Sequence, residues 1–289
     1  MEVELRIHIN WLRNKNMIIN IGTAGIPASC KGKSTIDGVR RIKELDLQCL
    51  EVEFVRGVAM GNETAKDIGA TAEEFGIKLS VHAPYYINLN SDDKQKLEAS
   101  KKRILDSMER AHHMNAEAIA VHASYYGKDT PEKTYGNTKN ACIDILEKAE
   151  KNGFDDVKLG LETMGKQSQF GSLDELIKLS KEIKIIPYID WAHIFVRQRG
   201  AIDYAEIFDQ LERLKLKKIH SHFENVKKNS AGEFVDIHIP IDHSPAFEPL
   251  AKEILKRKTD ITLISESPLL EKDAIKMKNV FEGLGYKFN

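Results

Sequence analysis

The sequence predicts a single-domain α/β protein, a closed (β/α)8 TIM barrel. Short apolar or β-branched runs alternate along the chain with longer stretches that have the apolar spacing of helices. Successive runs start about 28 to 44 residues apart, which is the length of one βα unit. Eight such units in series favour a sheet that closes on itself.

The eight strands are expected at residues 17–22, 49–55, 77–83, 117–123, 157–163, 185–190, 217–223 and 261–267. The helices are expected at 34–47, 63–75, 91–114, 135–152, 172–183, 201–214, 246–258 and 270–283. Ser172 and Glu175 have the spacing of a capping box, which starts the fifth of these helices. An open doubly wound sheet is the alternative, but GTAGIPASCKGK after the first strand lacks its phosphate-binding glycine spacing.

The composition is that of an ordinary globular protein, with 42% hydrophobic and 30% charged residues. No linker divides the chain, so residues 17–289 are expected to form the catalytic barrel and residues 1–16 an N-terminal extension. No apolar run reaches the roughly 18–20 residues of a membrane span. Three widely spaced cysteines argue against a disulfide framework and favour the reducing cytoplasm. A formal net charge of −1 gives no general attraction to nucleic acid, so any such attraction has to be local.

Seven of the eight predicted strands end in a residue that can bind a metal or move a proton, and barrel enzymes place their chemistry at these ends. Each residue alone is most simply a hydrogen-bonded or salt-bridged core residue, but seven at one end indicate a site. A shared cation would also relieve the repulsion between neighbouring carboxylates. The strand-end residues are Glu53, His82, His122, Glu162, Asp190, His222 and Glu266.

Two further groups extend this set beyond the strands. His193 follows Asp190 by three residues, and Asp236 and His238 form an Asp-x-His pair in the loop expected after the seventh strand. Without Glu53, the candidates are five histidines and four carboxylates, more than the four to six ligands that one zinc or manganese ion takes. They suit two or three ions. Three divalent ions against four carboxylates predict a net positive centre, which attracts phosphate.

The other histidines are interpreted without a metal. His112 and His113 fall near the end of a predicted helix, where cationic side chains favour the helix dipole. His220 lies two residues before His222 and is interpreted as a partner of Glu51 inside the barrel. His243 is expected in a loop, as the substitute if the Asp-x-His pair is not a ligand pair.

Several segments, in this order and spacing, resemble the endonuclease IV family, the apurinic/apyrimidinic endonucleases among the xylose-isomerase-like TIM barrels. The similarity covers nearly the whole chain from about residue 17 onward, and it implies three zinc ions per chain, with manganese as an alternative. The segments are VHAPYYINL, VHASYYG, GLET, IDWAH, HFENVK, the Asp236-Ile-His238 pair and ISES. The implied ligands are His82 and His122 for the first ion, Glu162 bridging the first and second, Asp190, His222 and Glu266 for the second, and His193, Asp236 and His238 for the third.

The resemblance implies an endonuclease of DNA repair, a hydrolase that cuts DNA 5′ to abasic sites. A hydroxide bridging two of the three zinc ions would attack the phosphorus and leave a 3′-hydroxyl and a 5′-deoxyribose phosphate. Glu162 and Glu266 are the candidate catalytic residues, because they would lie close enough to orient this nucleophile. The implied partner is damaged double-stranded DNA, and the protein is expected to act as a monomer in the cytoplasm.

Loops at the same end of the barrel carry basic residues and a tyrosine pair. Basic side chains would contact phosphates, although loops are equally where solvated charges lie. The tyrosines follow His82, where the family inserts side chains into the duplex; the alternative is a buried pair packed under the loop. The candidate DNA-binding residues are Tyr85, Tyr86, Arg56, Lys31, Lys33 and Arg197.

Two departures from the family pattern suggest a divergent branch. The loop FVRGVAMG after the second strand lacks the polar character of the family's DNA-reading loop, and Glu224 and Asn225 replace a more usual Asn-Asp. The main alternative function is a single-metal sugar isomerase or epimerase of the xylose-isomerase-like class. Its quartet would be Glu162, Asp190, His222 and Glu266. The other five candidate ligands separate the two functions, because an epimerase has no need to assemble them.

Overall fold

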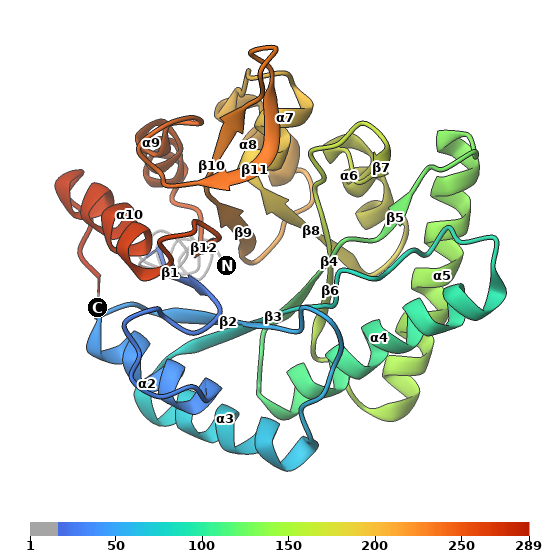
Figure 1. Cartoon of the computed structure of the whole chain (residues 1–289), viewed down its shortest axis with the longest axis horizontal. Coiled ribbons are helices and arrows are strands. Elements are labelled where there is room, and N and C mark those ends of the chain that lie inside the picture. Colours follow the sequence, from blue (N-terminus) through green and yellow to red (C-terminus); the bar gives the residue numbers. More distant parts are fainter. Residues whose placement is uncertain (1–16, 289) are drawn as a thin grey trace, which may run out of the picture.

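A computed structural model describes residues 17–288, and the predicted extension at 1–16 lies outside the described residues. Eight parallel strands form a closed barrel in the order β1-β12-β9-β8-β6-β4-β3-β2, surrounded by helices (Figure 1). All eight predicted strands are confirmed. They are β1 Ile19–Ala24, β2 Cys49–Glu53, β3 Lys78–His82, β4 Ala118–Val121, β6 Lys158–Glu162, β8 Ile185–Asp190, β9 Ile219–Phe223 and β12 Ile261–Ser265.

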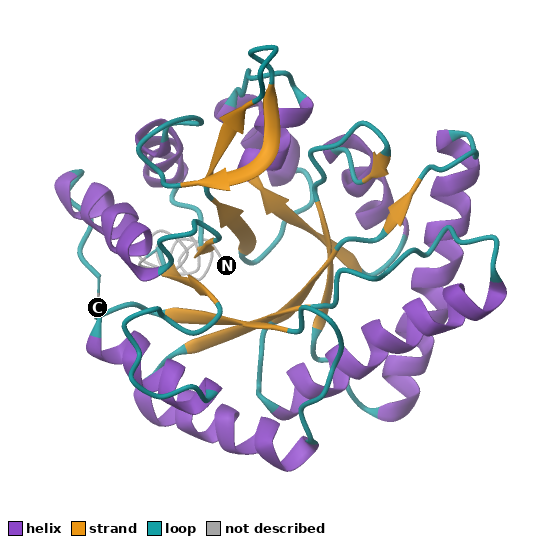
Figure 2. Cartoon of the chain, viewed as in Figure 1, coloured by secondary structure: helices purple, strands orange, loops and turns teal. Residues whose placement is uncertain are grey.

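The eight predicted helices are also present, and they form the outer layer in Figure 2. Ser172 caps the helix α6 with the predicted capping box. Within residues 17–288 no helix is long and apolar enough to cross a membrane. The predicted helices are α2 Thr35–Glu44, α3 Asn62–Phe75, α4 Lys94–His113, α5 Pro131–Asn152, α6 Leu173–Glu182, α8 Tyr204–Glu212, α9 Phe247–Arg257 and α10 Glu271–Gly283.

Three features were not predicted, and all lie above the carboxyl ends of the strands. A short helix, α7 (Trp191–Arg197), follows β8 directly. Two strands, β5 (Ser124–Tyr125) and β7 (Gln169–Phe170), pair with each other. A hairpin of β10 (Asn225–Lys228) and β11 (Phe234–Ile239) stands where the sequence predicted a loop, at the top of Figure 1. Asp236 and His238 therefore lie on a strand, and the prediction of a loop there is wrong.

The alternation of side chains along each strand separates an apolar layer from a polar interior. On β2, Leu50 and Val52 belong to the apolar core under the helices, whereas Glu51 alternates with them and lies inside the barrel. Gly160 makes room for the interior side chain Tyr188, because a Cβ at this glycine would lie 2.9 Å from Tyr188 Cδ2. The barrel interior thus holds polar groups that reach up to the strand ends.

Candidate metal centre

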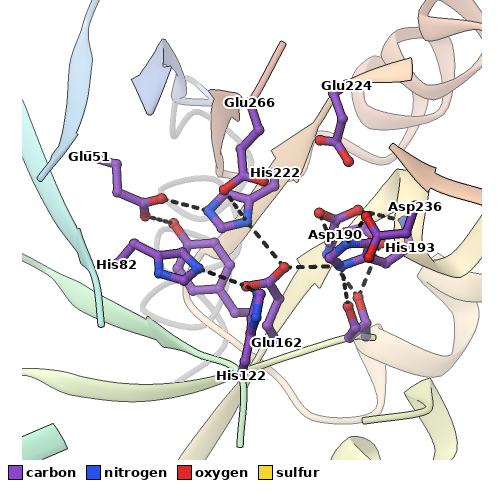
Figure 3. A network of polar contacts seen from close by, with 12 residues as sticks. Glu51, His82, His122, Glu162, Asp190, His193, His222, Glu224, Asp236 and Glu266 are labelled. Atoms are coloured by element: carbon purple, nitrogen blue, oxygen red, sulfur yellow. Dashed lines mark hydrogen bonds and ion pairs between the residues drawn. The ribbon is translucent and has the colours of Figure 1, made fainter. Parts of the chain in front are cut away.

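The carboxyl ends of the strands gather all nine predicted ligands in one mouth of the barrel (Figure 3 labels most of them). The strands β3, β6 and β8 contribute their last residues, and His122 and Glu266 directly follow β4 and β12. The remaining ligands come from elements that the sequence did not reveal, except for His222 on β9. The nine are His82, His122, Glu162, Asp190, His193, His222, Asp236, His238 and Glu266.

Glu162 lies at the centre of the mouth, with histidines on both sides. Its Oε2 atom is 3.3 Å from His82 Nε2 and 3.0 Å from His122 Nε2. Its Oε1 atom is 3.1 Å from His193 Nδ1 and 3.6 Å from His222 Nδ1. Oε2 thus faces the two ligands of the first group, whereas Oε1 faces His222 of the second group and His193 of the third.

The second group consists of Asp190, His222 and Glu266, the residues expected to hold the second ion. Glu266 Oε1 lies 3.4 Å from His222 Nδ1. Asp190 lies at the end of β8, and its Oδ1 atom accepts a hydrogen bond of 2.6 Å from the backbone N–H of His193. This bond caps the N-terminus of α7 and explains the Asp-x-x-His spacing. The other oxygen, Oδ2, remains available to a ligand.

The third group lies between α7 and the hairpin. His193 Nε2 is 3.2 Å from Asp236 Oδ1, and His238 Nε2 is 3.4 Å from the same oxygen. Asp236 and His238 are two residues apart on β11, so both side chains point to the same face of this strand. The hairpin therefore brings the Asp-x-His pair down onto the helix that carries His193.

Most of the histidines have one ring nitrogen near a fixed polar group and the other nitrogen toward the mouth. His82 Nδ1 is 2.7 Å from Ala83 O, and His238 Nδ1 is 3.2 Å from Glu266 O. Such contacts fix the tautomer and the ring orientation of metal-binding histidines. The arrangement leaves the Nε2 atoms of both rings for a cation.

These side chains fit divalent cations. Ligand atoms about 2.1 Å from a tetrahedral zinc ion lie about 3.4 Å from one another, which matches the distances across all three groups. Buried atoms of the mouth also have no hydrogen-bond partner within residues 17–288, among them both oxygens of Glu162, Asp190 Oδ2 and His222 Nδ1. Buried carboxylate oxygens without hydrogen-bond donors are costly, and cations would remove this cost.

Without cations, the buried groups of the mouth compete for protons. Burial raises the pKa of Asp190 to about 6. Burial opposes charge on His82, but the contact with Glu162 and the charge of Glu53 raise the pKa of this histidine to about 10. Burial also raises the pKa of Glu53 to about 8. The carboxylates thus hold protons on the rings, and bound cations would take their place.

Glu51, expected inside the barrel as a partner of His220, instead contacts the candidate ligand His222. It is fully buried, and its Oε1 atom is 2.7 Å from His222 Nε2. Its Oε2 atom accepts hydrogen bonds from Tyr188 Oη and Ser80 Oγ, at 2.7 and 2.8 Å. This network orients His222 so that Nδ1 faces the mouth. The alternation of Glu51 with the apolar residues of its strand was the available signal.

The predicted pairing of Glu51 with His220 is therefore wrong. His220 lies deeper, with its Nε2 atom 3.9 Å from Glu117 Oε2, and burial lowers the pKa of its ring to about 4. Barrel strands tilt, so residues equally far from two strand ends do not lie at the same height. His243 is exposed beyond β11 and belongs to none of the candidate groups within the described chain.

Glu224, noted in the sequence only as a departure from the family pattern, also lies among the candidate ligands. It follows β9, is fully buried and brings a fifth carboxylate to the candidate ligands. Three divalent cations would consequently leave a smaller positive excess than the four predicted carboxylates indicate. Glu224 follows His222 by two positions, and this spacing was the signal that could have found it.

The tyrosine pair lies at the edge of the mouth. Tyr85 is 42% exposed and Tyr86 is 67% exposed, so the alternative of a buried pair is wrong. The Tyr85 ring lies against His82, with ring centroids 5.1 Å apart, and against His122, at 5.5 Å. Both tyrosines, with Tyr125, line a groove of about 540 Å³. Aromatic surface is therefore available directly beside the candidate metal ligands.

The predicted basic residues differ in their surroundings. Lys31, Lys33 and Arg56 are exposed on loops. Arg197 is half-buried, and its guanidinium donates hydrogen bonds to the carbonyl oxygens of Met164, Lys166 and Gln169. This arginine holds the loop after β6 in place, and its contact with DNA remains a prediction.

Comparison with known proteins agrees with this architecture. The family described as xylose isomerase-like TIM barrels matches residues 39–281. The uncharacterized protein MJ0133 of Methanocaldococcus jannaschii is 34% identical over 280 residues, which cover 94% of this chain and all of the relative. A protein named probable endonuclease 4, from Mycoplasmopsis synoviae, is 27% identical over 219 residues, covering 73% of this chain and 74% of its own length.

Solved structures share the fold at low sequence identity. Endonuclease IV from Thermus thermophilus has a TM-score of 0.66 and 19% identity, covering 90% of this chain and 98% of that one. A D-tagatose 3-epimerase-like protein has a TM-score of 0.69 and 19% identity, covering 90% and 96%. The family match spans most of the barrel. The chain therefore belongs to the xylose isomerase-like TIM barrel family.

Proposed function

We propose that this protein is a metal-dependent phosphodiesterase that cuts DNA 5′ to abasic sites. The observation that carries the proposal is the convergence of nine candidate ligands in one mouth. Four of them would suffice for a single-ion isomerase, which has no need to assemble the other five as metal ligands. The sequence similarity to a probable endonuclease 4 supports the same activity.

The residues of the mouth would divide the work as follows. His82 and His122 would hold one ion, with Glu162 between it and the ion of Asp190, His222 and Glu266. Bound ions would supply Lewis acidity that polarises a phosphodiester and lowers the pKa of a water molecule. The carboxylates of Glu162 and Glu266 would orient that water by accepting its hydrogen bonds. Glu51 would keep the His222 ring in place during the reaction.

The rim offers groups that suit a nucleic-acid partner. Exposed Tyr85 and Tyr86 stand beside the candidate ligands, where an aromatic side chain could enter a base step at a lesion. Exposed Lys31, Lys33 and Arg56 would contact backbone phosphates. We propose damaged double-stranded DNA as the partner and zinc or manganese as the metal.

A sugar isomerase or epimerase is the second candidate function. The quartet Glu162, Asp190, His222 and Glu266 alone would hold one divalent ion, and the fold matches an epimerase-like protein. The histidines outside the quartet would then face sugar hydroxyls. Two carboxylates beside one ion could move a proton between carbon atoms.

Incubation of the full-length protein with a duplex containing one abasic site separates the two functions. We expect one nick 5′ to the lesion, a 3′-hydroxyl product and loss of cutting with a chelator. His193→Ala should abolish cutting, because it removes a ligand that only the phosphodiesterase needs, whereas the control His243→Ala should cut normally. Turnover of a ketose without nicking, or full cutting by His193→Ala, would overturn the proposal.

A further inference from the structure

Glu224 is a buried carboxylate without a hydrogen-bond donor among the described residues. It is fully buried, and neither carboxylate oxygen accepts a hydrogen bond from residues 17–288. It lies two residues after His222 on an extended segment, so both side chains enter the mouth from β9. Figure 3 shows the carboxylate pointing toward Asp190 and Asp236. A buried carboxylate in such a position is costly unless a cation meets it.

Candidate ligands surround the Glu224 carboxylate on two sides. Its Oε1 atom is 3.7 Å from His238 Nε2. Potential ligand atoms of Glu224, His193 and His238 all lie within 4.8 Å of one another, and the same holds for Glu224, Asp190 and Glu266. Glu224 thus lies beside ligands of both the second and the third group.

We propose that Glu224 is a tenth ligand of the metal centre and binds the same divalent cation as His193 and His238. The inference rests on the metal centre of the proposed function and does not depend on the reaction. The endonuclease IV family, which the sequence resembles, more usually has a neutral asparagine at this position. This chain therefore adds an anionic ligand there. A carboxylate binds zinc or manganese more strongly than an amide does.

The added ligand changes what this cation can do. Three protein ligands leave one position of a tetrahedral ion open to substrate, whereas four ligands close it. With Asp236 as the remaining ligand, the chain itself encloses the ion. The cation would then tie β9, α7 and β11 together and leave the reacting phosphate to the ions held around Glu162.

Metal content of purified full-length variants tests this inference. Zinc-loaded wild type, Glu224→Gln and Glu271→Gln are desalted, counted by mass spectrometry of the intact protein, and titrated with a chromogenic chelator. Glu271→Gln is the matched control, because Glu271 is another buried glutamate, but its oxygens accept hydrogen bonds from the backbone N–H groups of Ala28 and Ser29 and it lies outside every candidate group of the described residues. Circular dichroism confirms that each variant is folded.

Glu224→Gln should hold one ion fewer than wild type, or release one ion about 100-fold more readily, while Glu271→Gln keeps the full number. Wild-type count and affinity in Glu224→Gln, or the same loss in Glu271→Gln, would overturn the inference. If Glu224→Gln does not fold, Glu224→Asp keeps the charge on a shorter arm and should release one ion first; unchanged release would overturn it. A wild type that binds its ions but does not cut abasic DNA refutes the proposed function alone.

Discussion

The carboxylates at the two ends of the barrel have different kinds of partner. At the amino-terminal end, Lys218 Nζ lies 2.9 and 2.8 Å from the two oxygens of Glu117, so this carboxylate is fully paired. At the carboxyl-terminal end, the ion-pair contacts of Glu162 within the described chain are all with histidines. A lysine stays protonated and therefore keeps its ion pair. A histidine ring can release its proton and bind a cation instead. Paired charge thus marks the scaffold, and carboxylates facing histidines mark the functional end.

The largest expected effect separates these two ends by activity. If the proposed function holds, Glu162→Gln should lower cleavage of abasic DNA at least about a thousandfold, because it removes the carboxylate proposed to lie between two ions. Glu117→Gln should leave cleavage unchanged and cost about 1 kcal/mol of unfolding free energy, because it breaks a partly exposed pair. Steady-state kinetics and urea denaturation measure both. Equal losses of activity in the two variants would show that the two ends of the barrel do not differ in function.

An intermediate effect is expected for the network behind the ligands. Glu51→Gln should weaken zinc binding about 10- to 100-fold, because the Glu51 carboxylate orients the His222 ring. A competition titration with a chelator measures the affinity, and Ser80→Ala, which removes only a hydrogen bond to Glu51, should have a smaller effect. Unchanged affinity in Glu51→Gln would place His222 outside the metal centre.

The smallest effect is expected for Glu271, a carboxylate whose two oxygens both accept hydrogen bonds from the backbone. Glu271 accepts hydrogen bonds from the backbone N–H groups of Ala28 and Ser29, at 2.9 and 2.8 Å. Burial opposes its charge, but these bonds keep its pKa below the ordinary value. A lowered pKa contributes stability above the ordinary value of about 4.5 and loses it as the pH falls further.

Glu271→Gln should therefore be about 1 kcal/mol less stable than wild type at pH 7, and the difference should shrink below pH 4. Urea denaturation at several pH values measures it. A difference that grows with acidity would contradict the assignment.

The strand ends were predictable because the barrel has a regular period. Apolar runs at the spacing of βα units located all eight strands. The barrel topology alone then brings residues such as His82 and Glu162 to one end. The helix α7 was missed because it is a single short segment, although Asp190 carried its capping signal. The contact of Glu51 with His222 depends on strand tilt, which no local pattern encodes. Glu224 was not counted as a ligand because His222 was taken as the last ligand that this strand supplies.

The number of divalent ions bound by the purified wild-type protein tests the proposed three-ion metal centre most directly. Mass spectrometry of the intact chain, before and after chelation, counts them without assuming a substrate. The gathered ligands predict about three zinc or manganese ions per chain, all lost to the chelator. A single bound ion would contradict the account and favour the isomerase quartet.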